Sequence, residues 1–114
     1  MGMHLPPDVE RKILAALAPP LDVSERKFQG FVIDLLKLNS WDYYHTHDSR
    51  RSNSGFPDLA CFRERSLFIE LKTETGKLSP AQEKWQKILI AAGEKTYVFR
   101  PSDWPEIVRI LSGK

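Results

Sequence analysis

The sequence has a single cysteine, no long apolar run and little net charge, and each scarcity excludes a class of protein. Its one cysteine, Cys61, cannot form a disulfide within the chain, so we expect a reducing compartment and a buried thiol. No apolar run approaches the ~18 residues of a membrane-spanning helix, and no signal-peptide pattern is present. We therefore expect a cytoplasmic protein.

The net charge is only +2, so total charge alone does not indicate a nucleic-acid partner. The placement of the basic residues is more informative. Arg50 and Arg51 lie in a polar segment of small residues that runs directly into Pro57 and Asp58. Together with Lys77, they are candidate contacts to DNA phosphates, although a solvated loop would explain them too.

A chain of 114 residues is the size of one domain. We divide it into residues 1–20, with an appended helix between two proline pairs, and a domain over residues 21–114. Apolar periodicity and turn residues predict the order α-α-β-β-β-α-β-α, an α/β fold with a mixed central sheet flanked by helices. The expected helices cover residues 8–18, 22–38, 80–92 and 103–111, and the expected strands cover 41–47, 59–62, 67–72 and 96–99.

Two neighbouring expected strands bring charged residues to one end of the sheet. Side chains alternate along a strand, so Glu70 and Lys72 share a face with Phe68, opposite to a fully apolar face. We expect a hairpin whose turn covers residues 63–66, which places Asp58 opposite Leu71 and beside both charged residues. Asp58 could instead be an ordinary turn residue, and Glu70 with Lys72 an exposed pair that protects an edge strand.

These residues suit divalent-metal chemistry. Mg²⁺ prefers oxygen ligands and is usually held by one or two carboxylates with water and substrate phosphate. Asp58 and Glu70 are the expected metal ligands, with the carbonyl of Leu71 as a third oxygen. Lys72 would then orient the attacking water or stabilise charge on the phosphate. A zinc site has little support, because one cysteine and three scattered histidines give no ligand framework.

The pattern Pro57-Asp58 followed by Glu70-Leu71-Lys72 resembles the PD-(D/E)xK signature of a nuclease superfamily. The longer pattern from about residue 24 to 101 resembles its VRR-NUC (virus-type replication-repair nuclease) family. The resemblance implies a restriction-endonuclease-like core and a Mg²⁺- or Mn²⁺-dependent DNA phosphodiesterase, often selective for flaps or branches. The residues that carry the longer resemblance are Gly55, Phe56, Pro57, Asp58, Leu59, Glu70, Leu71, Lys72, Gly76, Lys77, Leu78, Ser79, Gln82, Trp85 and Gly93.

Small stand-alone members of that family resemble dimeric Holliday-junction resolvases of phage origin. The resemblance therefore implies a homodimer that acts on branched DNA in recombination and repair, in a bacterial or phage-infected cell. It also assigns Glu25, as a metal ligand or water-positioning residue, and Gln82 to the site. The residues alone leave both open, since Glu25 also completes a capping box with Asp22, and Gln82 completes one with Ser79.

Three further expectations concern the burial of aromatic, aliphatic and histidine side chains. Trp41, Trp85 and Trp104 are expected in the core or at an interface. The helix over residues 80–92 is expected to bury Trp85, Ile88, Leu89 and Ala92. His45 and His47 fit an exposed strand face better than a paired ligand or a proton shuttle.

Two other functions compete with the structure-specific nuclease. A non-catalytic DNA-binding module would keep the fold, but it has no need of two carboxylates facing phosphates. A sequence-reading restriction enzyme usually needs recognition elements for which about 80 matched residues leave little room. Symmetric nicking of a junction requires two active sites related by a two-fold axis, so the homodimer would use residues 8–18, the edge at residues 41–44, or both.

Overall fold

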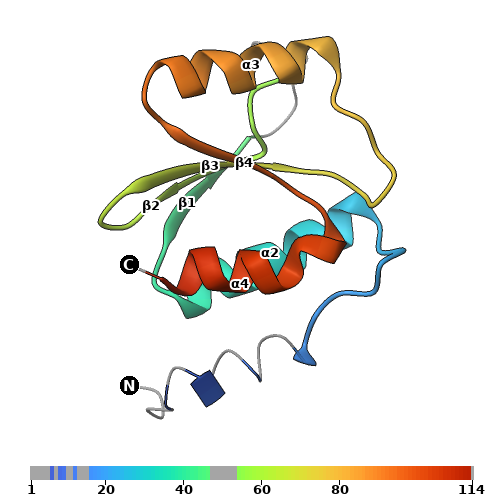
Figure 1. Ribbon diagram of the computed structural model, residues 1–114, viewed down its shortest axis with the longest axis vertical. Helices are drawn as coiled ribbons and strands as arrows, with labels where there is room; N and C mark the ends of the chain where they lie inside the picture. The colour runs from blue at the N-terminus through green and yellow to red at the C-terminus, as the bar shows by residue number, and fades with distance from the viewer. Residues whose placement is uncertain (1–5, 7, 10–11, 13–15, 47–53, 114) are drawn as a thin grey trace.

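The computed structural model describes residues 6, 8–9, 12, 16–46 and 54–113. A mixed sheet lies between two helical layers, with α2 and α4 on one face and α3 on the other (Figure 1). This confirms the α/β class and the expected order of elements from the second expected helix onward. The elements are α2 (Glu25–Leu38), β1 (Asp42–His45), β2 (Leu59–Phe62), β3 (Ser66–Leu71), α3 (Pro80–Ala91), β4 (Lys95–Phe99), a 3₁₀ turn η1 (Pro101–Asp103) and α4 (Trp104–Ser112).

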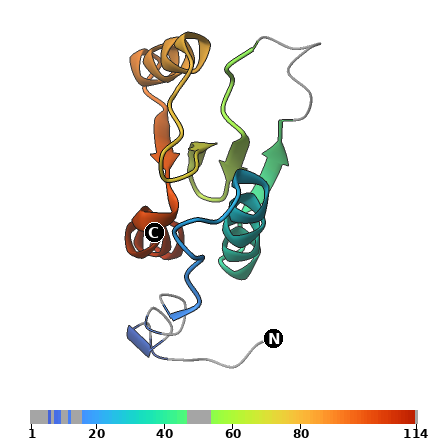
Figure 2. The ribbon, with the colours of Figure 1, turned by 90° about the vertical axis from the view of Figure 1, so that its right-hand side faces the viewer.

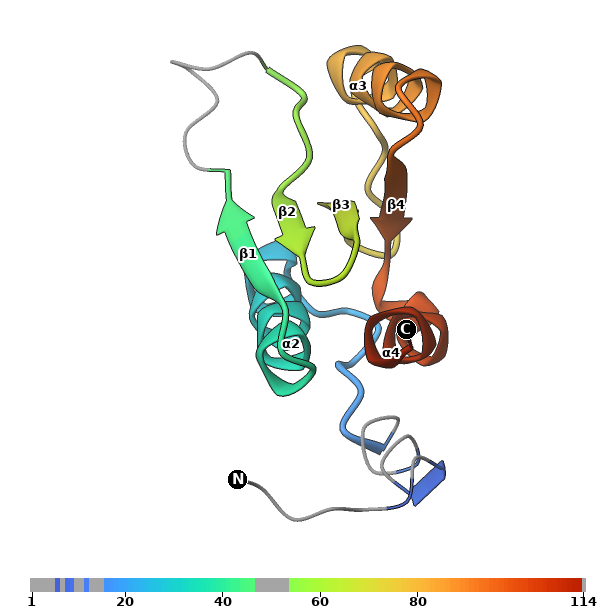
Figure 3. The same cartoon turned by 90° about the vertical axis from the view of Figure 1, so that its left-hand side faces the viewer.

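The sheet has four strands in the order β1-β2-β3-β4. The first three form an antiparallel meander, and β4 pairs parallel to β3 after the α3 crossover. The side view in Figure 3 shows the strands between α3 and the α2–α4 layer. Within the described residues, β1 and β4 are the two edges of the sheet, and β3 is one of the two strands paired on both sides.

The core lies between the sheet and the α2–α4 layer. Leu67, Ile69 and Leu71 of β3 are at most 1% exposed and face this layer, as the alternation predicts. Both helices contribute an apolar stripe at helical spacing. The stripe residues are Phe28, Val32, Leu35 and Leu36 in α2, and Trp104, Ile107, Val108 and Leu111 in α4. The hydrophobic effect thus fixes which face of β3 is left for the charged residues.

Helix α2 begins two residues later than the expected capping box implies. Its N-cap is Ser24, whose hydroxyl accepts a hydrogen bond from the backbone N–H of Lys27. The expected capping box of Asp22 with Glu25 is therefore wrong, because Glu25 is the first residue of the helix and not the third. Asn39 ends the helix, and Ser40, with φ of +62°, turns the chain toward β1.

Helix α3 buries less of its surface than the sequence suggests. The expected Ser79 capping box is present, but among the four apolar residues only Leu89 is buried. Ile88 is 41% exposed, Ala92 is exposed and Trp85 is half-buried, so that expectation is wrong. Helix α3 packs chiefly over β4, at one edge of the sheet, and a helix at an edge presents only a narrow stripe to it.

The end of α4 is held by the β2–β3 turn. Trp41 Nε1 donates to the carbonyl of Leu111 over 2.8 Å, and Arg63 and Arg65 stack on the Trp41 ring while they bind the last carbonyls of α4. Trp41 and Trp104 are each 4% exposed, which confirms both as core residues. Asp103 is the N-cap residue of α4, and its side chain accepts from the N–H of Arg100.

Most of the expected N-terminal helix lies outside the described residues. In residues 8–18 the structure describes 8, 9, 12 and 16–18, of which 8, 9, 12 and 16 are helical. Figure 2 shows the described chain from residue 16 running up to the start of α2. No helix in the described parts of the chain is both long and apolar enough to cross a membrane.

Candidate active site

The β2–β3 hairpin sets the spacing of the two central carboxylates. Its loop holds three residues, 63–65, so Phe62 pairs with Ser66 and Leu59 with Ile69. We expected a four-residue turn with Asp58 opposite Leu71, and that register is wrong by one residue. Continuing the observed register by one pair places Asp58 opposite Glu70, on the same face of the sheet. The two carboxylates are thus cross-strand neighbours.

Asp58 is held by its backbone and by its side chain. Thr46, just after β1, donates its N–H to the Asp58 carbonyl (2.9 Å) and its hydroxyl to the Pro57 carbonyl (2.8 Å). One carboxylate oxygen of Asp58, Oδ2, accepts from the backbone N–H of Leu71 over 2.7 Å. In a strand, the N–H and carbonyl of one residue point to the same side, so the Leu71 carbonyl also faces Asp58.

Glu70 is a buried carboxyl group. It is 1% exposed, and its Oε2 accepts from Nε2 of Gln82 over 3.1 Å. Its Oε1 is buried with no hydrogen-bond partner among the described residues. Burial, and then the nearby negative charge of Asp58, raise the pKa of Glu70 to about 9. A carboxyl group in this environment is stabilised by a bound proton or by a nearby cation.

Gln82 makes both the capping-box hydrogen bonds and a contact with Glu70. Its Oε1 accepts from the Ser79 N–H (2.9 Å), and its own N–H donates to the Ser79 hydroxyl (3.2 Å), which completes the capping box. Its amide nitrogen remains to bind Glu70. The start of α3 is therefore tied to the carboxylate on β3 through a single side chain.

Glu25 and Lys72 lie within electrostatic reach of the same carboxylates. Burial and the negative charge of Asp58 raise the pKa of Glu25, while the ammonium of Lys72 opposes them. Lys72 likewise opposes the rise in the pKa of Glu70. Glu25 thus approaches the site from the first turn of α2, although its side chain is exposed.

The structure places the other predicted residues differently. Arg50, Arg51 and His47 lie outside the described residues. Lys77 is exposed on the loop between β3 and α3, and His45 is half-buried on β1. Cys61 is fully buried, which raises the pKa of its thiol to about 12 and confirms it as a core residue.

Sequence reasoning missed Arg100, which shapes the loop after β3. Its guanidinium donates to the carbonyls of Thr73 (2.7 Å), Gly76 (2.6 Å) and Glu74 (3.4 Å). Lys72 precedes that loop, and its N–H donates to the Phe99 carbonyl (3.0 Å). The sequence signal that could have indicated this role is the position of an arginine directly after the expected strand over residues 96–99. Thr46, between the two histidines, was missed in the same way.

An aromatic group fixes α3 over the site. Phe56 packs edge-on against Phe68 (6.0 Å between ring centroids) and Trp85 (5.0 Å). Gly55, with φ of +89°, lies so close to the first turn of α3 that an added Cβ would be 2.4 Å from the Ala81 carbonyl carbon. The segment that carries Asp58 and the helix that carries Gln82 are therefore packed as one unit.

Comparison with known proteins agrees with this geometry. The family model described as the VRR-NUC domain matches residues 33–103, more than half of the chain. The chain belongs to the VRR-NUC domain family. A solved structure titled "VRR_NUC domain" is 20% identical and superposes with a TM-score of 0.62 over 74% of this chain and 92% of its own. No curated protein sequence matches this chain significantly.

Membership gives this VRR-NUC domain a nuclease-type fold and confirms the resemblance found in the sequence. The matched segment contains Asp58, Glu70, Lys72 and Gln82, whereas Glu25 lies before it. At 20% identity the solved structure supports the fold alone.

The site of this VRR-NUC domain suits a hard divalent cation. In the described part of the chain, no three Asp, Glu, His or Cys side chains converge closely enough to form a complete ligand cluster. Mg²⁺ needs only one or two carboxylates beside water and substrate oxygens. Asp58 and Oε1 of Glu70 could supply those two, and the Leu71 carbonyl lies on the same side of β3 as its N–H, which Asp58 binds. The donor set is all oxygen, as Mg²⁺ or Mn²⁺ requires.

Proposed function

We propose that this protein is a metal-dependent, structure-specific DNA endonuclease that hydrolyses phosphodiester bonds in branched DNA, as a Holliday-junction resolvase does. The observation that carries the proposal is the cross-strand pair of Asp58 and Glu70, with one buried carboxylate oxygen of Glu70 left without a partner. A buried carboxyl oxygen without a hydrogen-bond partner lowers the stability of the fold, and carboxyl groups with strongly raised pKa values cluster at functional sites.

Asp58, Glu70 and the Leu71 carbonyl would hold Mg²⁺ or Mn²⁺. When bound, the cation would polarise a phosphoryl oxygen and lower the pKa of a water. Asp58 is kept in place by the Leu71 N–H, and Glu70 by the amide of Gln82, so both ligands are oriented before substrate arrives.

Lys72 and Glu25 would act on the substrate side of the site. The Lys72 ammonium would stabilise negative charge that builds on the phosphate or would orient the attacking water. Glu25 lies near both Lys72 and Asp58, and its raised pKa suits a group that positions a water and accepts its proton.

Size and symmetry support a homodimer if the protein cleaves junctions. A single domain of 114 residues covers little DNA, and two symmetric nicks need two sites related by a two-fold axis. We therefore propose a homodimer and DNA contacts from Arg50, Arg51 and Lys77. Changing Arg50 and Arg51 to alanine together should weaken binding to all DNA structures alike and flatten its salt dependence.

The substrate is tested by cleavage of labelled four-way junction, flap and linear duplex DNA. Paired symmetric nicks in the junction alone support the resolvase. Cleavage of flaps alone would support a nuclease but not a resolvase. A monomer in light scattering would also argue against the resolvase. Binding without any cleavage would favour a non-catalytic DNA-binding module that keeps the nuclease fold.

A further inference from the structure

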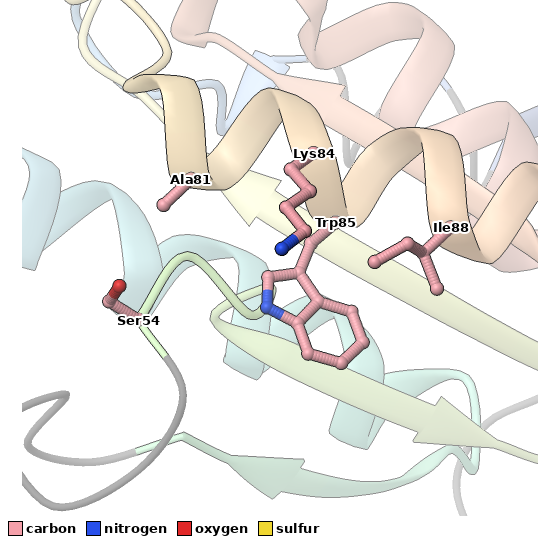
Figure 4. A pocket seen from close by; sticks show the side chains of 5 residues that line it. All are labelled: Ser54, Ala81, Lys84, Trp85 and Ile88. Atoms are coloured by element: carbon pink, nitrogen blue, oxygen red, sulfur yellow. The ribbon is translucent and has the colours of Figure 1, made fainter.

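A pocket along α3 has a lining that suits a nucleic-acid base. It has a volume of about 430 Å³ and is lined by Ser54, Ala81, Lys84, Trp85 and Ile88. Figure 4 shows the Trp85 ring in its centre, with Lys84 and Ile88 on the same side of α3 and Ser54 across from them. The lining thus combines an aromatic ring, an aliphatic side chain and an ammonium group.

Packing contacts connect this pocket to the residues around Asp58 and Glu70. Trp85 follows Gln82 by three residues on α3, so the two side chains are surface neighbours ~5–6 Å apart at Cβ. Trp85 also packs on Phe56, two residues before Asp58. The close contact of Gly55 with Ala81 holds the Ser54 side of the pocket against the helix.

We propose that this pocket takes one unpaired nucleobase of the DNA next to the phosphate that is cut, with the base stacked on Trp85 and its phosphate near Lys84. The proposal deepens the proposed function and rests on it. Aromatic side chains with nearby cations are the usual platform for unpaired bases. Bases within a duplex are covered on both faces by their neighbours, so only a base that has left the stack can reach the ring.

This pocket would explain selectivity for branched DNA without sequence recognition. A branch point or flap junction exposes unstacked nucleotides, whereas linear duplex does not. Every base has a π face, so stacking on Trp85 would favour the structure of the substrate and not its sequence. Ile88, which is 41% exposed, would cover the edge of the stacked base.

Binding is tested in EDTA with a short single-stranded oligothymidylate and a hairpin duplex of matched length. Trp41 and Trp104 are each 4% exposed, so quenching of intrinsic fluorescence on titration reports chiefly on Trp85. We expect quenching by the single strand and not by the hairpin, and loss of quenching in Trp85→Phe. An abasic site scanned along the oligonucleotide should lower affinity about ten-fold at one position.

The chain offers matched controls on the same helix. Lys84→Ala should weaken single-strand binding several-fold more than Lys87→Ala, since both lysines are exposed but only Lys84 lines the pocket. Ile88→Ala should do the same relative to Ile90→Ala, which is 63% exposed and outside the pocket.

Failure of this inference is separable from failure of the nuclease. Equal effects within each control pair, or equal quenching by hairpin and single strand, would overturn the base pocket. If Glu70→Ala still abolishes cleavage in that case, the nuclease stands without the pocket. If the pocket variants behave as expected while the wild type cuts no DNA, the base-binding surface stands and the catalytic proposal falls.

Discussion

Nε2 of Gln82 donates a hydrogen bond of 3.1 Å to Oε2 of Glu70, while Oε1 of the same amide accepts from the first N–H of the α3 cap. One side chain therefore sets both the start of a helix and the orientation of a buried carboxylate. In metal sites, the loss of such an outer contact typically lowers metal affinity or activity by about 10–100-fold.

Changing Gln82 to glutamate separates its two functions. A glutamate preserves the capping box with Ser79 but replaces the donor to Glu70 with a repelling carboxylate. We expect nearly unchanged helix stability and a fall in cleavage rate of about 10–100-fold. Gln82→Ala should lose the same activity and, in addition, about 1 kcal/mol of folding free energy. Thermal unfolding and single-turnover cleavage measure the two effects, and equal activity of Gln82→Glu and wild type would contradict the assignment.

Asp58 offers a similar separation of charge from hydrogen bonding. Asp58→Asn retains an oxygen that accepts from the Leu71 N–H, whereas Asp58→Ala leaves that N–H without its partner. Both variants should lose cleavage, and only the alanine variant should also lose about 1–3 kcal/mol of stability. Chemical denaturation measures the difference. Cleavage retained by Asp58→Asn would remove the carboxylate from catalysis.

The pH dependence of stability tests the burial of Glu70. Its pKa is raised from an ordinary 4.5 to about 9 in the folded, metal-free protein, so the unfolded chain ionises first as pH rises. This group therefore stabilises the fold fully below about pH 4.5, and the contribution is lost as pH rises toward 9, by at most about 1.4 kcal/mol per pH unit.

Glu70→Gln cannot ionise and should escape this loss. In EDTA, the variant should unfold at the same temperature as wild type near pH 4 and at a higher temperature at pH 8, although it cannot cut DNA. Scanning calorimetry across this pH range measures the difference. A variant that is less stable than wild type at pH 8 would show that Glu70 is ionised and well paired.

Two glycines test the packing of the Asp58 segment on α3. Gly55 and Gly93 both have positive φ, but an added Cβ meets the Ala81 backbone only at Gly55. Gly93→Ala should cost about 1 kcal/mol through backbone strain alone. Gly55→Ala should cost at least about 2 kcal/mol and also slow cleavage, because the segment leading to Asp58 must shift. Equal losses in the two variants, by denaturant titration, would argue against the close contact.

The sequence predicted the faces of the strands better than their register. Strict alternation along residues 67–72 placed Glu70 opposite the apolar face, and its hydrogen bond with Gln82 of α3 confirms that placement. The register was wrong by one residue because it depends on whether the loop holds three or four residues, and the Arg63–Ser66 segment is compatible with both.

Local patterns could not decide between competing uses of a polar side chain. Ser24 and Asp22 are both good N-cap residues, and the structure has Ser24 in that position. Arg100 binds carbonyls of the loop after β3, and these lie 24 to 27 positions before it in the sequence. A local sequence pattern cannot predict a contact over that separation. The burial of α3 was overestimated because the sequence does not say that the helix lies at the edge of the sheet.

The most direct test of the central claim is single-turnover cleavage of a labelled four-way junction with Mg²⁺, Mn²⁺ or EDTA, by wild type and by Glu70→Ala and Lys72→Ala. We predict metal-dependent cleavage by the wild type and none by either variant, with both variants folded and still able to bind the junction. Cleavage in EDTA, or by the Glu70→Ala variant, would contradict the account.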